Sequence, residues 1–194
     1  PRDWKSNLSF DIKLKYNFAI QLEGTYSKVM EGLLFQSINR KEDLKANFVG
    51  ADTRPYYTTT GDAAKINTNF TNVFLLTNTN QGYRYNITLG ITKTATHYNG
   101  FLGYSYGESK DISSTVRNSH AANFEWNQAL VANSPSLTYS NFDLRHKFIS
   151  YHFYDLKFQS SSLRFGLIYN GRSGSPFSYV YEGDVNRDGS GKND

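Results

Sequence analysis

The chain has no cysteine and no long apolar run, and these two absences exclude several classes of protein. Without cysteine there is neither a disulfide scaffold nor a cysteine-based zinc site, and an envelope location remains compatible. No stretch approaches the roughly 18 consecutive apolar residues of a transmembrane helix, and no signal-peptide pattern opens the chain. The 194 residues therefore predict one domain, or one large piece of a bigger domain, built without these devices.

Strong charge and catalytic motifs are also missing. The net charge is +4, and the 21 basic residues are scattered with no basic stripe, so we expect no nucleic-acid partner. The segment GRSGS at 171–175 departs from the G-x-S-x-G nucleophile elbow, because Ser175 stands where glycine is needed. No HExxH or other metal-ligand spacing joins the four histidines, and we predict that the chain is not an enzyme. The histidines are His97, His120, His146 and His152.

What the chain does have is an unusual supply of aromatic residues. Phe, Trp and Tyr make up 16% of the residues, including 15 Tyr and 14 Phe, yet the mean hydropathy is −0.59. Tyr and Phe alongside Asn, Thr and Ser suit strands with one side in an apolar phase and the other in water.

Strict alternation of apolar and polar residues is the dominant pattern. Leu8, Phe10, Ile12 and Leu14 share one side of a strand, and period two over about ten residues predicts β-structure. Tyr83 to Ile91 repeats the pattern, with Ile87 and Leu89 on the apolar side. The phase blurs at 149–154, where we expect a bulge or a girdle of aromatics. Six strands are predicted, at 7–16, 18–36, 73–94, 101–110, 141–158 and 162–178.

The connections between these strands alternate in length. A three-residue loop, Lys15-Tyr16-Asn17, pairs Leu14 with Phe18 and puts Asn17 in the left-handed conformation. A two-residue Asn99-Gly100 turn and a turn at 159–161 are also predicted. Long polar connections cover 38–71 and 111–140, and a third begins after Pro176.

Short turns on one side and long loops on the other are the plan of an outer-membrane β-barrel. The alternating pattern also fits a soluble antiparallel sandwich, which is the alternative fold. Two loops of about 30 residues each would be unexpected in such a sandwich. Charges on the polar side, such as Asp11, Lys13 and Arg145, favour a water-filled lumen. We read Asp143 and Arg145 as solvated charges of the barrel wall.

The last residues contain half of a calcium-loop pattern. Asp184-Val185-Asn186-Arg187-Asp188-Gly189 fits D-x-[DN]-x-[DN]-G, in which alternate side-chain oxygens face the ion. Loop position twelve, which wants a bidentate carboxylate, is the residue after Asp194. The segment is either a structural calcium site, with ligands Asp184, Asn186, Asp188 and Asp194, or an ordinary turn-rich loop.

Aromatic residues of the long loops are candidate ligand contacts. Tyr56, Tyr57 and Trp126 can stack on sugars or peptide side chains, whereas strand tyrosines suit the membrane-interface girdles or the lipid face. The strand tyrosines in question are Tyr26, Tyr104, Tyr106 and Tyr169.

Three segments carry a resemblance to a known family. LTNTNQGYRYNITLGITKTATHYNGFLGYSYGESKD (76–111), SNFDLRHKFISYHFY (140–154) and SGSPFSYVYEGDVNRDGSGKND (173–194) resemble TonB-dependent outer-membrane receptors of the Bacteroidetes type. The group is the one with a carboxypeptidase-regulatory-like domain before the plug, related to SusC-like transporters. The three segments cover under half of the chain.

The resemblance implies a 22-stranded barrel closed by a plug, in the outer membrane of a Gram-negative bacterium. Residues 1–194 are then part of one barrel domain, about six transmembrane strands, whose plug and remaining strands lie elsewhere. The implied partners are outer-membrane lipid, the TonB complex through the plug region, and in some systems a surface lipoprotein lid. The implied function is energised uptake of a polar ligand; the alternative is a non-transport barrel serving as an adhesin or in a secretion or motility assembly.

Overall fold

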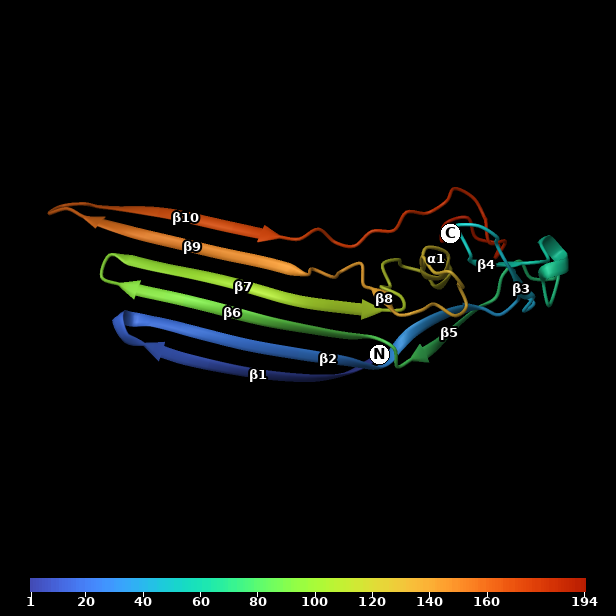
Figure 1. Ribbon diagram of the computed structural model, residues 1–194, viewed down its shortest axis with the longest axis horizontal. Helices are drawn as coiled ribbons and strands as arrows, with labels where there is room; N and C mark the ends of the chain where they lie inside the picture. The colour runs from blue at the N-terminus through green and yellow to red at the C-terminus, as the bar shows by residue number, and fades with distance from the viewer.

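The computed structural model describes the backbone of residues 1–194, and all side chains except those of residues 45 and 46. The fold is all-β, with an antiparallel sheet of eight strands and a separate two-stranded ribbon. Figure 1 shows the long strands side by side in a single layer. The strands are β1 Arg2–Leu14, β2 Phe18–Ser37, β3 Leu44–Asn47, β4 Pro55–Tyr57, β5 Phe74–Thr79, β6 Tyr83–Ala95, β7 Tyr98–Asp111, β8 Thr138–Tyr139, β9 His146–Lys157 and β10 Ser162–Arg172.

Six long strands form the main path of the sheet, in the order β1-β2-β6-β7-β9-β10. Each pairs antiparallel with its neighbour, while β5 adds to the end of β2 and β8 to the end of β7. The ribbon joins β3 to β4. A short helix, α1 (His120–Glu125), and two 3-10 turns, Lys15–Asn17 and Gly61–Ala64, complete the elements. None of the described helices has both the length and the apolar character required to cross a membrane.

Short connections gather at one end of the sheet and long ones at the other (Figure 1). The short turns are 15–17, 96–97 and 158–161. Three short turns were predicted, and the first and third lie where the sequence pattern placed them. The first turn is confirmed in detail, because Leu14 pairs with Phe18 and Asn17 has φ 57°. Tyr16 is also left-handed, at φ 62°.

The predicted Asn99-Gly100 turn is wrong. Ala95 pairs with Tyr98, so the turn is Thr96-His97, and Asn99 and Gly100 lie inside β7. Glycine is required at position 100 for a steric reason, because a Cβ there would clash with the hydroxyl of Tyr98. That hydroxyl forms a hydrogen bond with Nδ1 of His152 at 2.6 Å. The glycine leaves room for the tyrosine ring to cross it.

The predicted strand 73–94 is interrupted between β5 and β6. Both pair with the 20-residue β2, and the chain bulges at 80–82 between them. Gly82 has φ 135°, and a Cβ there would lie 2.8 Å from Cγ2 of Val29, whose N–H donates to the Gly82 carbonyl. The bend requires glycine for both reasons.

Two other strand limits differ from prediction because the partner strand decides them. β1 starts at Arg2 since β2 extends far enough to pair with it. β10 ends at Arg172, which pairs with Lys147, one residue from the start of β9. No bulge occurs at 149–154, where both neighbouring ladders keep a regular register and aromatics occupy both faces.

β9 starts at His146, not at the predicted residue 141, because polar contacts hold the preceding residues outside the ladder. The carboxylate of Asp143 is buried and accepts a hydrogen bond from the backbone N–H of Ser109 at 2.6 Å. The Arg145 guanidinium pairs with Asp143 and with Glu108, each at 3.2 Å. The expectation that Asp143 is a solvated charge is therefore wrong, and Arg145 is ion-paired beside it; the two residues hold the entry to β9 in place.

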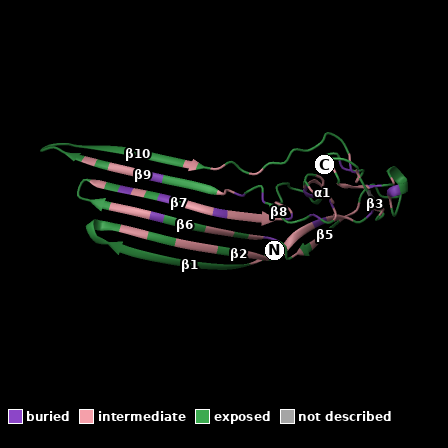
Figure 2. Cartoon of the chain, in the orientation of Figure 1, coloured by how far each residue is buried: buried purple, intermediate pink, exposed green. Residues whose placement is uncertain are grey.

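The long strands enclose no apolar core (Figure 2). Apart from Phe35 near the end of β2, the buried positions of the six long strands are serines and glycines. The apolar side chains of one face are exposed, for example Phe10 at 55% and Leu89 at 43%. A soluble sheet would cover such a face with a second layer, so this face is an unusual feature of the fold.

Candidate functional site

The three long connections come together at one end of the sheet, and we refer to them as the loop cap: residues 38–73, 112–145 and 173–194. Figure 1 shows α1, the β3–β4 ribbon and the C-terminus grouped beyond the arrowhead of β7, on the same side of the picture as β5. In the loop cap, segments distant in sequence meet through side chains, and it contains every residue predicted to bind a ligand.

A small apolar core supports the loop cap. Phe35, Phe124 and Ala132 are buried together, and Leu33 and Phe74 pack against them. The ring centroids of Phe74 and Phe124 are 5.5 Å apart. Helix α1 is capped by Ser119, whose hydroxyl accepts a hydrogen bond from the N–H of Ala122, and this places Phe124 over the end of β2.

Asn133 fixes the 112–145 connection to the end of β2. Its Oδ1 accepts from the Ser37 N–H and its Nδ2 donates to the Ser37 carbonyl, both at 2.8 Å. The side-chain amide of Gln36 donates to the Asn133 carbonyl at 3.0 Å. An amide can supply both bonds at once to one residue, so Asn133 continues the strand's hydrogen bonding by means of a side chain.

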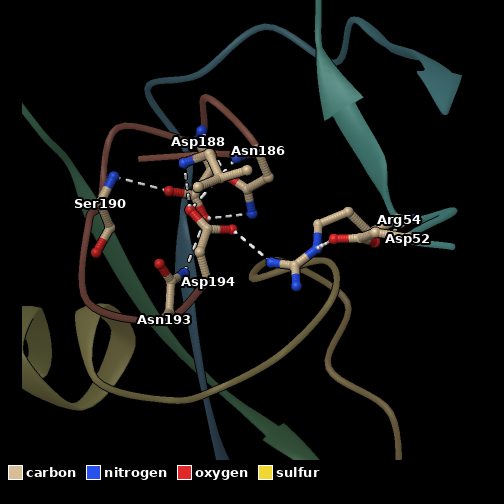
Figure 3. Close-up of polar contacts among 8 residues, drawn as sticks. Asp52, Arg54, Asn186, Asp188, Ser190, Asn193 and Asp194 are labelled. Carbon is tan, nitrogen blue, oxygen red and sulfur yellow. Dashed lines mark hydrogen bonds and ion pairs between the residues drawn. The ribbon is translucent and has the colours of Figure 1, made fainter. Parts of the chain in front are cut away.

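The acidic segment, residues 184–194, folds into consecutive turns closed by its own side chains (Figure 3). Asn186 Oδ1 accepts from the N–H of Asp188, and Asp188 Oδ1 accepts from the N–H of Ser190. Asp184 Oδ2 accepts from the N–H of Gly189, and Asp194 Oδ2 accepts from the N–H of Val185. Gly189, at loop position six, has φ 92°, which suits the sharp turn expected there.

The acidic segment also touches the other two connections. The Tyr57 N–H donates to the Asn186 carbonyl at 2.9 Å, and the Arg40 guanidinium donates to the Arg187 carbonyl at 2.5 Å. On the other side, the Ser190 hydroxyl donates to the Glu125 carbonyl at 3.2 Å. The segment thus bridges the β3–β4 ribbon and α1.

Negative charge is concentrated inside the acidic segment. Asp194 is buried and pairs with Arg54 at 3.3 Å, but Arg54 also pairs with Asp52 at 2.8 Å. Burial raises the pKa of Asp188, and the charge of Asp184 adds to the rise. Burial also raises the pKa of Asp194, with the charge of Asp188 acting in the same direction.

The three aromatic residues predicted to bind ligand lie in different surroundings. Tyr57 is buried with the Arg40 guanidinium 4.0 Å from its ring centroid. Tyr56 stacks on Phe48 at 4.8 Å. Trp126 remains 39% exposed, so of the three it has the side chain most available for stacking.

Trp126 is flanked by two cations. The Arg117 guanidinium lies 4.3 Å from the ring centroid, and the Lys192 ammonium lies 5.3 Å from it. Lys192 belongs to the acidic segment, as does Arg187, which lies 5.6 Å from the Tyr56 ring. The structure therefore gathers the predicted aromatics around the acidic segment, not around one cleft.

A cleft of about 780 Å³ opens between the end of β2 and the loops. Tyr57 is the predicted ligand contact that lines it. Arg40 and Asn133 line it as well, and sequence reasoning missed both because each acts through a partner far away in the chain. Its walls include Gln36, Ser37, Arg40, Tyr57, Ile66 and Asn133.

The remaining candidate groups have structural neighbours. The hydroxyl of Ser173, in the GRSGS segment, accepts a hydrogen bond from the His146 N–H at 3.2 Å. On the apolar face, Nδ1 of His146 forms a hydrogen bond of 2.8 Å with the hydroxyl of Tyr104. Among the side chains that the structure describes, no three His, Cys, Asp or Glu residues converge as a set that would hold a metal ion.

Comparisons with protein-family models, with curated proteins and with solved structures give no match to this chain. Two features of the chain itself then bear on function. One is the exposed apolar face of the sheet, and the other is the loop cap with its cleft and its acidic segment.

Proposed function

We propose that this chain forms part of the wall and the outer loops of an outer-membrane β-barrel of the TonB-dependent receptor type. The observation that carries the proposal is the apolar face of the six long strands, which is exposed in the chain and uncovered by any described element. In a lipid bilayer such a face is solvated by hydrocarbon, and the fold requires no second layer.

The apolar face forms a band across the sheet. One row of paired residues is Phe10, Leu22, Leu89, Tyr104 and Phe148, and the row beside it includes Ile12, Ile20, Ile91 and Leu102. These rows contain no charged residue. From Leu8 to Leu14 the band spans seven residues of β1, or roughly 20 Å at about 3.3 Å per residue, close to the ~25 Å apolar height of a barrel.

Charges on this face lie toward the strand ends. Near the short turns, the Lys93 ammonium bonds the Tyr16 carbonyl and lies 4.4 Å from the Phe18 ring centroid. Near the loop cap, Lys28 occupies the corresponding position on β2. Tyrosines accompany them, as in the interface girdles of barrels.

The opposite face is polar over β1, β2 and β6 and suits an aqueous lumen, while Phe101, Tyr151 and Phe153 form an aromatic patch on it where β7 meets β9. Arg84 pairs with Asp3 at 2.8 Å, and the hydroxyls of Thr88 and Ser105 are 2.9 Å apart. Asn7 donates to Glu23 at 2.6 Å. Ion pairs and hydrogen bonds of this kind are typical of a surface in contact with water. Placing the same charged and polar groups in hydrocarbon would cost free energy.

The edges of the sheet imply further strands in the same wall. β1 pairs only with β2 and β10 only with β9 among the described residues. Unpaired strand edges are prohibitively costly in lipid, so we expect further strands of a larger barrel at both edges. In a receptor of this type the loop cap would be the outward ligand-capturing surface, and a plug within the lumen would connect transport to TonB.

Two measurements on the full-length protein test the proposal. It should be recovered in the outer-membrane fraction and migrate on gels differently before and after heating; recovery as a soluble protein with unchanged mobility would contradict the barrel. The purified periplasmic domain of TonB should bind the detergent-extracted protein. A membrane barrel that does not bind TonB would instead support the adhesin or assembly-component alternative.

A further inference from the structure

The acidic segment holds more negative charge than its protein neighbours compensate. Asp188 is half-buried and Asp194 is buried, while Asp184 lies at the rim. Arg54 is shared between Asp194 and Asp52, and among the described side chains Asp184 and Asp188 form no ion pair. Carboxylates removed from water require a cation, a proton or several hydrogen bonds to remain stable there.

A second observation, independent of the carboxylates, concerns Asn193. This residue is 3% exposed, and its Oδ1 is buried without a hydrogen-bond partner. Its Nδ2 donates to Asp188 Oδ2 at 2.8 Å, so the amide is directed into the cluster, and Figure 3 shows it turned toward the carboxylates. A buried carbonyl oxygen without a partner costs about 1–3 kcal/mol, which a ligand can recover.

We propose that Ca²⁺ binding rearranges the side chains of the acidic segment, which do not converge on a metal site as they lie in the structure, so that oxygens of Asp184, Asn186, Asp188, Asn193 and Asp194 become the ligands. Ca²⁺ takes six to eight oxygen ligands in flexible geometry, and alternate side chains of a turn ending in glycine supply such a set. Three of the five ligands stand at positions one, three and five of the turn, followed by Gly189.

Two amides determine how the site closes. Asn186 and Asn193 each donate through Nδ2 to Oδ2 of Asp188. A half-turn of the Asn193 amide exchanges its nitrogen for an oxygen of almost the same size and position, whereas Asn186 keeps its Oδ1 on the Asp188 N–H. With a cation beside Asp188 the oxygen orientation becomes favourable, and the partnerless Oδ1 of Asn193 then acquires a ligand.

The site would act as a clamp on the loop cap. The Asn186 carbonyl receives the Tyr57 N–H and the Ser190 hydroxyl holds the Glu125 carbonyl, so ordering the acidic segment orders both neighbours. The weak Ca²⁺ sites of extracellular modules have Kd values of about 10⁻⁴–10⁻³ M, and we expect this range. The inference does not rest on ligand uptake, since the clamp would operate in an adhesin equally well.

Terbium luminescence on the full-length detergent-extracted protein, after removal of divalent ions, tests the site. Tb³⁺ should bind and be sensitised by Trp126, which lies beside Lys192, and Ca²⁺ should displace it with half-effect on the order of 0.1–1 mM. Asp188→Asn should weaken Ca²⁺ about tenfold or more, because affinity follows ligand charge. Asp62→Asn, at an exposed carboxylate paired with Lys65 on another turn, is the matched control and should change nothing.

Asn193→Asp and Asn193→Leu keep the proposal testable if Asp188→Asn does not fold. The first adds a charged ligand and should tighten Ca²⁺ binding, while the second removes the oxygen and should weaken it. Hydrogen exchange should also slow on Ca²⁺ addition at Tyr57 and in α1. Absence of Ca²⁺ displacement up to about 10 mM, or equal titrations for the wild type, Asp188→Asn and Asn193→Asp, would show a hydrogen-bonded turn only and overturn the proposal.

Discussion

The sheet and the loop cap are stabilised in different ways. In the six long strands the backbone ladders are regular, and the apolar side chains of one face are exposed. In the loop cap a few apolar residues are buried together, and side chains bond to the backbone of distant segments. In the proposed barrel the sheet depends on an apolar surrounding phase, whereas the loop cap has its own small core.

The largest effect is expected from Phe124→Ala, which tests whether the loop cap is stabilised by its own apolar core. Phe124 is 8% exposed and packs on Phe74, so truncation should cost about 3 kcal/mol of local stability. Hydrogen exchange in α1 should accelerate about 100-fold, while exchange in β6 and β7 stays unchanged. Leu130→Ala, at a 61%-exposed leucine of the same connection, is the control. Equal acceleration throughout the sheet would show that cap and sheet are one cooperative unit.

On the sheet side the matching change is Leu89→Arg. In a bilayer this charge on the apolar band should lower the free energy of unfolding by about 2–4 kcal/mol, while Thr88→Arg, one residue away on the polar face, should stay within about 0.5 kcal/mol. Denaturant unfolding in lipid vesicles measures both. Similar losses for the two variants would mean that the faces of β6 do not differ in solvent.

A smaller effect is expected where cap and sheet meet. Asn133→Ala removes both side-chain bonds to Ser37 and should destabilise the attachment of the 112–145 connection by about 1–3 kcal/mol. Asn133→Asp retains the acceptor and should lose less. Hydrogen exchange at the Ser37 amide reads out the attachment directly, and an unchanged rate in Asn133→Ala would show that the contact is incidental.

The smallest effect concerns the β3–β4 ribbon at acid pH. Burial acts to raise the pKa of Asp43, but hydrogen bonds from Thr59 and Thr58 outweigh it and hold the pKa below the usual 3.8. Ionised Asp43 therefore adds stability that is complete above pH 3.8 and is lost as the pH falls through the lowered folded pKa. The Thr59 amide, which donates to Asp43 at 2.6 Å, should lose exchange protection there, and Asp43→Asn should remove this pH dependence.

Local pattern was enough to predict the six long strands, but not the short strands β3, β4 and β8 inside the long connections. Alternation in residues 8–14 depends only on period two, and the structure places Phe10, Ile12 and Leu14 on one exposed face. The turn at 15–17 was predictable because pairing charge with apolar residues rules out the shorter loop. The predicted Asn99-Gly100 turn failed, since a glycine can serve a crossing tyrosine ring as well as a turn.

The loop cap was much less predictable because its contacts join distant residues. Nothing near Asn133 in sequence indicates its bonds to Ser37, and nothing near Tyr57 indicates that Arg40 covers its ring. Strand limits behave in the same way, since Arg172 ends β10 where β9 no longer offers a partner. The acidic turn was visible in sequence as a spacing, but its bridge to Glu125 was not.

Cysteine scanning of β6 tests the central claim most directly, because residues 1–194 contain no cysteine that would react in the background. Single cysteines at positions 84 to 91 of the full-length protein in membranes would be exposed to a water-soluble maleimide and, separately, to a lipid-dissolved one. We expect alternation: Ile87→Cys and Leu89→Cys should react with the lipid-dissolved maleimide, and Asn86→Cys and Thr88→Cys should react with the water-soluble one. Reaction of Ile87→Cys and Leu89→Cys with the water-soluble reagent alone would contradict it.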